Sequence, residues 1–523
     1  MDSSRPAVHQ GRGVAAGEAT ALGGTALQAF HGVLSRSLAF WEVWPLVGFA
    51  FVLVLVYLLT APVFGLPFDD SYISLQFARN LAGHGFLTFD GETASAGATS
   101  LLHVTILAIP IKLGVEPVKA SVAVGVLLQL GLVLAMYWLA WTIFKDRLVA
   151  TLSGASVGVM GYLVFDALNG METTLFLVVS TAAAAAFLGA RSEQRYLAAG
   201  LLAAVAVLTR PEGGLLLGAM GLYYLVNPER GEPVASLPAV RRLALLAGPS
   251  VVALIGLAAF YWATTGSPTP GAATAKYLFF REFELRRQLQ ADWVQTAVAN
   301  FIAPVLPWLA LAVFSLRRRE TLLFVFFWAS FIIMYFLLFP GGLGHYWYRY
   351  QHIFLPAIAV FGSAGLISFL RGHRWRRWDV VSAGLIGVVL LGALLLQYNS
   401  YRNRYADGVN LNETRQVAIA RFLRQVMPAG ATVATHDIGV IGYYSEREVV
   451  DLVGLVNPDV IDYHDGRRLR EYVDQVQPAY IVVFPSWEDR YLQLGLRDNP
   501  ALFEEIEVFW GDPEPFIVYK THY

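Results

Sequence analysis

The chain has 523 residues, of which 56% are hydrophobic and 15% are charged, and its formal net charge at pH 7 is −1. This composition is typical of a polytopic membrane protein rather than a soluble one, and a net charge near zero gives no indication of a nucleic-acid partner. Because cysteine is absent, disulfides, thiolate chemistry and cysteine-based metal sites are excluded.

The chain begins with a Gly/Ala-rich stretch that precedes the first apolar run. Residues 1–38 carry scattered arginines and are predicted to form a flexible cytoplasmic tail. Residues 41–63 are long enough to cross a bilayer and lack a convincing cleavage site, so we interpret them as a retained first membrane helix.

Two adjacent carboxylates, Asp69 and Asp70, follow this first span within the segment Phe68-Asp69-Asp70-Ser71-Tyr72. Carboxylates held close to hydrocarbon are costly, and their default interpretation is functional. Asp70 has an alternative role, because it could cap the amphipathic helix that follows. One cap does not require two aspartates, so Asp69 needs another explanation.

The later apolar runs bring the expected number of transmembrane helices to about 11. Residues 101–113 are too few to span comfortably and are predicted to lie at the outer interface. The Lys- and Arg-rich connections then fall on one face, as the positive-inside rule requires. The chain divides into a transmembrane domain, 39–399, whose first external loop is 64–119, and an extracytoplasmic α/β domain, 400–523. After residues 41–63, the expected spans are 120–144, 148–168, 174–190, 196–208, 215–226, 243–264, 293–315, 322–339, 353–370 and 380–396.

The C-terminal part changes character, with charges spread through it and short β-rich runs between amphipathic stretches. Its size suits a single core. The predicted helices are 414–426 and 468–476, and the predicted strands are 432–435, 449–452, 480–484, 506–509 and 516–519.

Two short turns between spans present charged residues at the outer face. Glu172 starts a span after Asn169-Gly170-Met171, and its alternative role is to complement a helix N-terminus. Arg210 and Glu212 flank a proline, and this pair could simply brace the turn.

Two further external segments carry positive charge against the topological bias. Lys276 and Tyr277 end a small-residue segment, and the segment 344–352 contains His345, Arg349 and His352. Lys and Arg both suit a phosphate, so we interpret these segments as candidates for binding an anionic ligand. The alternative is an aromatic belt whose basic residues reach lipid headgroups.

In this order the motifs resemble the GT-C glycosyltransferases of bacteria, and most closely the arabinofuranosyltransferase-like branch, with more distant likeness to aminoarabinose and protein mannosyl transferases. The resemblance implies that Asp69 is the catalytic carboxylate and that Lys276 and Arg349 hold the phosphate of a polyprenyl-phosphate sugar. Residues 95–98 lack the acidic and aromatic residues that relatives often carry there. The motifs are Asp69-Asp70-Ser71-Tyr72-Ile73-Ser74, Ala78-Arg79-Asn80-Leu81, Gly83-His84-Gly85, Gly170-Met171-Glu172-Thr173, Leu208-Thr209-Arg210-Pro211-Glu212-Gly213, Asp437-Ile438-Gly439, Gly442-Tyr443 and Asp451-Leu452-Val453-Gly454.

The expected function is inverting transfer of a sugar, such as arabinofuranose, to a glycan, lipid-linked or protein acceptor at the bacterial cell membrane. Asp69 would be the general base and the cations would stabilise the leaving phosphate. Asp70 and Glu172 would orient the base or, together with Asp69, hold a divalent metal, Mg²⁺ or Mn²⁺. The other candidate phosphate ligands are Arg210 and His352, and the candidate cavity or acceptor residues are Tyr72, Tyr277, His345 and His436.

Two other functions remain open at this point. The first is a transporter or lipid-carrier flippase with an external accessory domain, although transporters usually place ionisable groups near the midplane. The second is a sugar-binding or sensory module in which the C-terminal domain is the active part. His436 and Asp437 follow a strand, where α/β sheets usually expose ligand contacts, and their alternative role is to satisfy a local turn. We expect the C-terminal domain to be an acceptor platform.

Overall fold

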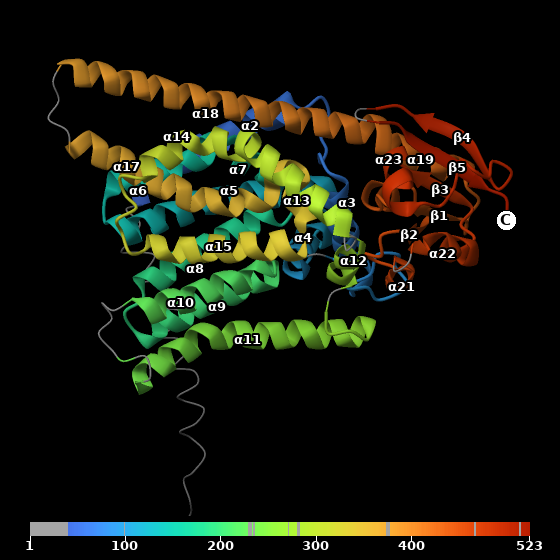
Figure 1. The fold of residues 1–523 in the computed structure, drawn as a ribbon, viewed down its shortest axis with the longest axis horizontal. Helices are drawn as coiled ribbons and strands as arrows, with labels where there is room; N and C mark the ends of the chain where they lie inside the picture. The colour runs from blue at the N-terminus through green and yellow to red at the C-terminus, as the bar shows by residue number, and fades with distance from the viewer. Residues whose placement is uncertain are drawn as a thin grey trace, which may run out of the picture.

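The computed structural model describes residues 40–98, 100–227, 233, 236–269, 271–279, 283–372, 377–464, 467–511 and 514–523. The expected tail, 1–38, lies outside these residues. Figure 1 shows long helices running side by side, with a sheet-containing domain at one end of the bundle. The helices of the bundle are α2 (Phe40–Thr60), α5 (Pro117–Phe144), α6 (Arg147–Val159), α7 (Gly161–Leu168), α8 (Thr173–Gly189), α9 (Glu193–Thr209), α10 (Glu212–Val226), α11 (Leu237–Thr265), α13 (Phe283–Ala297), α14 (Ala303–Ala312), α15 (Thr321–Leu338), α17 (Leu355–Gly372) and α18 (Arg377–Leu411).

The bundle is that of a polytopic membrane protein. Among the described residues, six helical stretches are long and apolar enough to cross a membrane. The pair α6 and α7, bent by 59° at their break, makes a seventh if it forms one span. Each of the segments expected to span is helical, but α8 and α10 are among the shorter apolar helices, so the expected number of about 11 spans stays a prediction.

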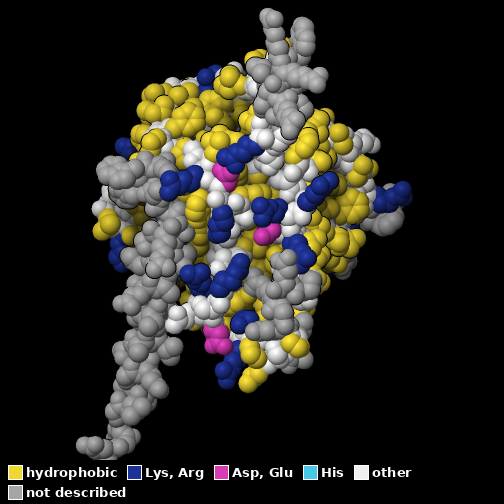
Figure 2. All heavy atoms as spheres, turned by 90° about the vertical axis from the view of Figure 1, so that its left-hand side faces the viewer, with side chains coloured by type: hydrophobic (Ala, Val, Ile, Leu, Met, Phe, Trp, Pro, Cys, Tyr) yellow, Lys and Arg dark blue, Asp and Glu magenta, His cyan; other side chains and the backbone are white. Residues whose placement is uncertain are grey.

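Local sequence sets where these helices begin. Pro117 starts α5, where the Glu116 side chain accepts hydrogen bonds from the next two free backbone N–H groups. Asp146 caps α6 in the same way and pairs with Arg371 from the end of α17. Figure 2 views this end of the bundle, opposite the sheet domain, and shows Lys and Arg side chains gathered over it.

The predicted first external loop lies between the bundle and the sheet domain (Figure 1). It contains α3 (Asp69–His84) and, after a loop closed by an isolated bridge between Thr88 and Ala94, α4 (Leu101–Lys112). The short α4 has the length expected for a helix that does not span. Other short helices at this end are α12 (Gly271–Phe279), α16 (His345–Tyr348) and the 3₁₀ turn η4 (Arg349–Phe354).

The C-terminal domain is built on a five-stranded sheet with the order β2-β1-β3-β5-β4. Strand β1 pairs in parallel with β2 and β3, whereas β5 pairs antiparallel with β3 and β4. All five expected strands are present, although β4 begins three residues earlier than predicted. The strands are β1 (Thr432–Thr435), β2 (Glu448–Asp451), β3 (Tyr480–Val483), β4 (Phe503–Phe509) and β5 (Phe516–Thr521), and the helices include α19 (Ala418–Val426), α20 (Gly439–Tyr444), α21 (Ile461–His464), α22 (Leu469–Val476) and α23 (Pro485–Trp487).

The bundle and the C-terminal domain are joined by a continuous helix. Helix α18 runs along the bundle and into the C-terminal domain, so the boundary expected at residue 400 falls inside a helix. One buried apolar cluster extends from the bundle to residues of the sheet, such as Val433 and Val518, and a second cluster is confined to the C-terminal domain. The two parts therefore share a continuous core.

Candidate active site

Asp69 is buried where the first external loop meets the C-terminal domain. Its Oδ2 accepts a hydrogen bond of 2.8 Å from the N–H of Gly439, and its Oδ1 accepts one of 2.7 Å from the N–H of Val440. Burial raises the pKa of Asp69 to about 7, against the lowering effect of these two donors. An ionised carboxylate has about four lone-pair sites. Asp69 can therefore still receive a proton, as a general base must.

Asp70 has a different environment from its neighbour. Helix α3 begins at Asp69 and its N-cap is Phe68, so the interpretation of Asp70 as the N-cap is wrong: Asp70 is the second residue of the helix. The side chain of Asp70 is 28% exposed, and its Oδ2 lies 3.9 Å from Nε2 of His345. Asp70 is thus the more accessible carboxylate of the pair.

Asp437 is a third carboxylate of this region, and its sequence context indicates only a local turn or a ligand contact. Its Oδ2 accepts a 3.0 Å hydrogen bond from Nε2 of Gln416. Burial, together with the negative charges of Asp69 and Asp70, raises the pKa of Asp437 well above its ordinary value. The motif Asp437-Ile438-Gly439 marked this segment as functional in the sequence, but no local sequence pattern indicated that the segment faces the first loop.

His436 lies inside the C-terminal domain. Its ring stacks on Trp487 at 4.3 Å between centroids and lies 5.1 Å from that of Phe484. Burial lowers the pKa of His436 to about 3, so the imidazole is neutral at pH 7. Neither ring nitrogen has a hydrogen-bond partner among the described residues. The structure therefore places His436 in an aromatic core, and a role in contacting the acceptor stays a prediction.

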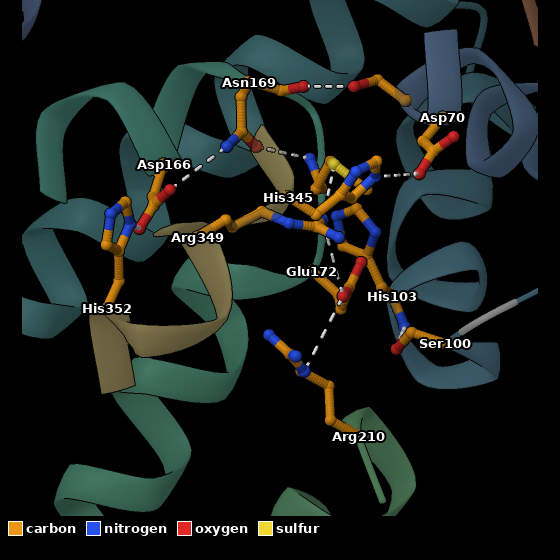
Figure 3. Close-up of polar contacts among 12 residues, drawn as sticks. Asp70, Ser100, His103, Asp166, Asn169, Glu172, Arg210, His345, Arg349 and His352 are labelled. Carbon is orange, nitrogen blue, oxygen red and sulfur yellow. Dashed lines mark hydrogen bonds and ion pairs between the residues drawn. The ribbon is translucent and has the colours of Figure 1, made fainter. Parts of the chain in front are cut away.

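Glu172 lies between two buried arginines (Figure 3). Its Oε1 is 3.9 Å from Nε of Arg210 and 3.9 Å from Nη1 of Arg349. Burial by itself would raise the pKa of Glu172, but the charges of Arg349 and Arg210 hold it below its ordinary value. Glu172 is therefore an ionised residue that aligns two cations.

Arg210 also forms a short ion pair with Glu212, at 2.5 Å between Nη2 and Oε1, and Tyr335 donates a hydrogen bond to that carboxylate. The Arg210–Glu212 pair therefore braces the turn around Pro211, which is the alternative role that the sequence left open. Arg210 Nη1 nevertheless has no hydrogen-bond partner in the described part of the chain. One strong donor of this guanidinium is available to a ligand.

Arg349 is only 2% exposed, so its guanidinium does not reach lipid headgroups. It lies over the ring of Tyr350, 4.9 Å from the centroid, and its Nε also lacks a hydrogen-bond partner among the described residues. The residues before it, Tyr346, Trp347 and Tyr348, have positive φ values of 45°, 56° and 67°. Such backbone strain in non-glycine residues is typical of functional sites.

A cavity of about 520 Å³ is lined by Arg210, whereas Arg349 is not among the lining residues and its neighbour Tyr350 is. Glu172, Arg210 and Glu212 form its charged wall, and apolar side chains of α15, such as Met334 and Leu338, form another. Helix α12 contributes Tyr277 to the lining. Lys276 belongs to the same helix, but its side chain lies outside the described residues. The cavity thus combines an apolar wall with a guanidinium donor.

His352 is not among the residues that line this cavity. Its Nδ1 lies 2.7 Å from Oδ2 of Asp166, and Asn169 donates a 3.3 Å hydrogen bond to the other oxygen of that carboxylate (Figure 3). Asp166 was missed, although a carboxylate inside an expected span was a signal for it. Direct phosphate binding by His352 stays a prediction, and the pairing points to a supporting role.

Tyr72 and His103 complete the surroundings. Tyr72 is buried, and its ring packs against those of Tyr443 and Tyr444 from the C-terminal domain. His103, in an apolar segment where sequence gave it no role, is buried near Glu172, and burial lowers its pKa to about 4. Within the described residues, no three His, Asp or Glu side chains form a group that could hold a metal, so Asp69, Asp70 and Glu172 do not assemble into one.

Comparison with known proteins gives one partial match to a family. Residues 402–520 match a model described as a domain of unknown function, DUF8728. Among curated proteins, no sequence matches significantly.

Solved structures match over most of the chain. ArnT from Cupriavidus metallidurans, bound to undecaprenyl phosphate, aligns with a TM-score of 0.53 and 14% identity over 92% of this chain and 98% of its own. The oligosaccharyltransferase AglB from Archaeoglobus fulgidus, in complex with an inhibitory peptide and a dolichol-phosphate, aligns with a TM-score of 0.55 and 13% identity over 92% and 74%. The arabinofuranosyltransferase AftD from Mycobacteria aligns with a TM-score of 0.50 and 14% identity over 91% and 41%.

At these identities the similarity establishes the fold. The chain has the GT-C fold of polytopic membrane glycosyltransferases, and the resemblance expected from the sequence motifs is confirmed at that level.

Proposed function

We propose that the protein is a glycosyltransferase that moves a sugar from a polyprenyl-phosphate donor to an acceptor outside the cytoplasm. The observation that carries the proposal is the cavity, in which an apolar wall adjoins Arg210, whose Nη1 has no hydrogen-bond partner among the described residues. An isoprenoid chain needs apolar surface and its phosphate needs fixed cationic donors. Two of the structural neighbours hold polyprenyl phosphates of this kind.

Two groups of residues take part in the proposed reaction, one around Asp69 and one around the arginines. Asp69 takes the proton from the acceptor hydroxyl, whose oxygen forms a bond to the anomeric carbon as the bond to the phosphate oxygen breaks. The phosphate leaves with the electron pair and is stabilised by Arg349 and Arg210, aided by Lys276. A single displacement of this kind inverts the anomeric configuration. General-base catalysis contributes ~10²–10⁴-fold.

The proposal places the C-terminal domain on the extracytoplasmic side of the cell membrane. The Lys and Arg side chains gathered at the opposite end of the bundle support this orientation (Figure 2). The division into domains 39–399 and 400–523 is supported by the family match, which begins at residue 402.

Transfer is tested by incubating the purified protein with a panel of polyprenyl-phosphate sugars and measuring released carrier phosphate. Arabinofuranose is the first sugar to test, because the motifs resemble that branch and AftD is a structural neighbour. A cell-envelope glycan is the first acceptor. Failure to release carrier phosphate from every donor would contradict the proposal.

The second candidate, a transporter or lipid-carrier flippase, is favoured by one observation. Asp166 and His352 form a buried pair within the bundle, and ionisable groups inside membrane segments often mark transport pathways. Movement of a labelled polyprenyl phosphate across vesicles, without sugar transfer, would support this candidate.

A further inference from the structure

We propose that the C-terminal domain is a working part of the active site: the backbone N–H groups of Gly439 and Val440 position the carboxylate of Asp69. This inference rests on the proposed function. It assigns a role to residues 402–520, which match a domain of unknown function. It also differs from an acceptor platform, because the domain acts on the catalytic group itself.

The contact requires glycine at position 439. A Cβ on Gly439 would lie 2.0 Å from the carbonyl oxygen of Asp69 and 2.8 Å from its Oδ2. Real Cβ atoms essentially never approach backbone so closely, so any other residue would push α20 away from α3. The glycine therefore permits both N–H groups to reach the carboxylate at hydrogen-bond distance.

Several other contacts hold the C-terminal domain against the first loop. The guanidinium of Arg79 lies 4.4 Å from the ring centroid of Tyr443 and donates a hydrogen bond to that residue's carbonyl. A Cβ on Gly97 would lie 2.4 Å from the carbonyl oxygen of Leu455. The docked arrangement is thus an extended interface and not a single contact.

The two hydrogen bonds have a defined chemical effect. Each carboxylate oxygen receives one N–H, which fixes the orientation of the carboxylate and stabilises its ionised form. Burial and the charges of Asp70 and Asp451 act in the opposite direction, and Asp437 adds a further negative group facing Asp69. The two N–H groups of the C-terminal domain therefore keep the pKa of Asp69 lower than burial alone would make it, so more of the carboxylate stays ionised and able to act as a base.

The first experiment compares Gly439→Ala with Gly442→Ala in the same helix. A Cβ on Gly442 would lie 2.7 Å from the ring of Phe89 and 3.7 Å from Cγ2 of Val449, and none of its three nearest atoms belongs to Asp69. We expect Gly439→Ala to lower kcat about 100-fold, as misplacement of a catalytic group does, while the KM for the donor stays within about threefold. We expect Gly442→Ala to stay within about threefold of wild type in both constants.

The pH profile separates positioning from a general loss of structure. Because the N–H groups stabilise the ionised carboxylate, their removal raises the pKa of Asp69, and the acidic limb of the kcat profile of Gly439→Ala should move to higher pH. Equal kcat values and equal profiles for the two alanine variants would overturn the inference.

A second experiment weakens the interface at a distance from Asp69. Arg79→Gln removes the guanidinium that lies 4.4 Å from the ring centroid of Tyr443 and donates a hydrogen bond to the carbonyl oxygen of that residue, while Asp69 and Gly439 stay unchanged. We expect kcat to fall and the acidic limb of the kcat profile to move to higher pH, in the same direction as for Gly439→Ala but by a smaller amount. A wild-type kcat with an unchanged pH profile would contradict the inference.

Wild-type transfer is measured first, so that the two proposals fail separately. An inactive wild type with every donor contradicts the proposed function and the inference together. An active wild type with an unaffected Gly439→Ala variant contradicts the inference alone. If Gly439→Ala does not fold, the kcat and pH profile of Arg79→Gln still test the inference.

Discussion

Asp69 and Asp70 are neighbours in the chain, but the structure gives them different chemistry. Asp69 is 7% exposed and receives two backbone N–H groups, whereas the side chain of Asp70 is 28% exposed and faces His345. Burial combined with fixed donors suits a base whose direction matters, and partial exposure suits contact with a mobile substrate. The geometry therefore suits Asp69 to the role of base and Asp70 to substrate contact, a distinction that their adjacent positions in the sequence did not make.

Asp69→Asn should leave the protein folded but reduce turnover by ~10²–10⁴-fold, because the amide preserves the shape of the side chain and loses its basicity. Asp70→Asn is the matched control and should have a milder effect. Turnover of both variants under saturating donor and acceptor provides the measurement. An Asp69→Asn variant that keeps more than about a tenth of wild-type turnover would rule out the base.

The pH dependence of transfer should follow the protonation of Asp69. The base acts when deprotonated and burial raises its pKa to about 7, so turnover should rise with pH through neutrality and fall at lower pH. Because Asp70 and Asp437 lie close, the apparent pKa belongs to the group of carboxylates together. A rate that is unchanged between about pH 5 and pH 8 would contradict this prediction.

Arg349→Ala should weaken use of the lipid-phosphate donor by about 10–100-fold in KM, as loss of a charged hydrogen bond does, with a smaller effect on the acceptor. Lys276→Ala should act in the same direction. Arg371→Ala is the control, because Arg371 is exposed and pairs with Asp146 at the end of α17. Separate titrations of donor and acceptor distinguish the roles, and an effect confined to the acceptor would refute phosphate binding.

At the scale of elements, α18 and α20 decide how the two parts of the chain cooperate. Helix α18 carries the chain continuously from the bundle into the C-terminal domain. Helix α20 then returns to α3 and supplies the partners of Asp69. The C-terminal domain is therefore held at both its entry helix and its contact with the first loop.

A chain that ends after Tyr398 should keep donor binding if it folds, because every residue lining the cavity precedes position 351. It should lose turnover with every acceptor, including small soluble ones, because the partners of Asp69 are removed. Donor binding and transfer to a small and a large acceptor are measured on the truncated protein. Loss of transfer to the large acceptor alone would favour the acceptor platform that the sequence suggested.

The two ends of the whole molecule differ in structure and in charge. The sheet domain and helix α3, which begins with Asp69 and Asp70, lie at one end, and the gathered Lys and Arg side chains lie at the other (Figures 1 and 2). The proposed transfer needs this polarity, because the phosphate of a membrane-bound donor and an external acceptor would have to meet at one membrane face.

The orientation can be tested with single cysteines in the cysteine-free chain. Glu448 is exposed in the C-terminal domain, and Arg371 is exposed at the opposite end. In intact cells, an impermeant maleimide should label Glu448→Cys and should label Arg371→Cys only after lysis. The reverse pattern would invert the proposed topology.

Hydrophobic periodicity and segment length are local properties, so they were enough to locate the helical segments, the five strands and the polar turns. The sequence also pointed to Asp69, Glu172, Arg210 and Arg349, since charges beside apolar runs stand out in any membrane chain. Which of these charged side chains contact one another follows from how the helices and the C-terminal domain pack. The pairing of Asp166 with His352 joins residues 186 positions apart, and the contact of Asp69 with Gly439 joins residues 370 apart. Such contacts follow from packing of whole elements, and no local pattern encodes them.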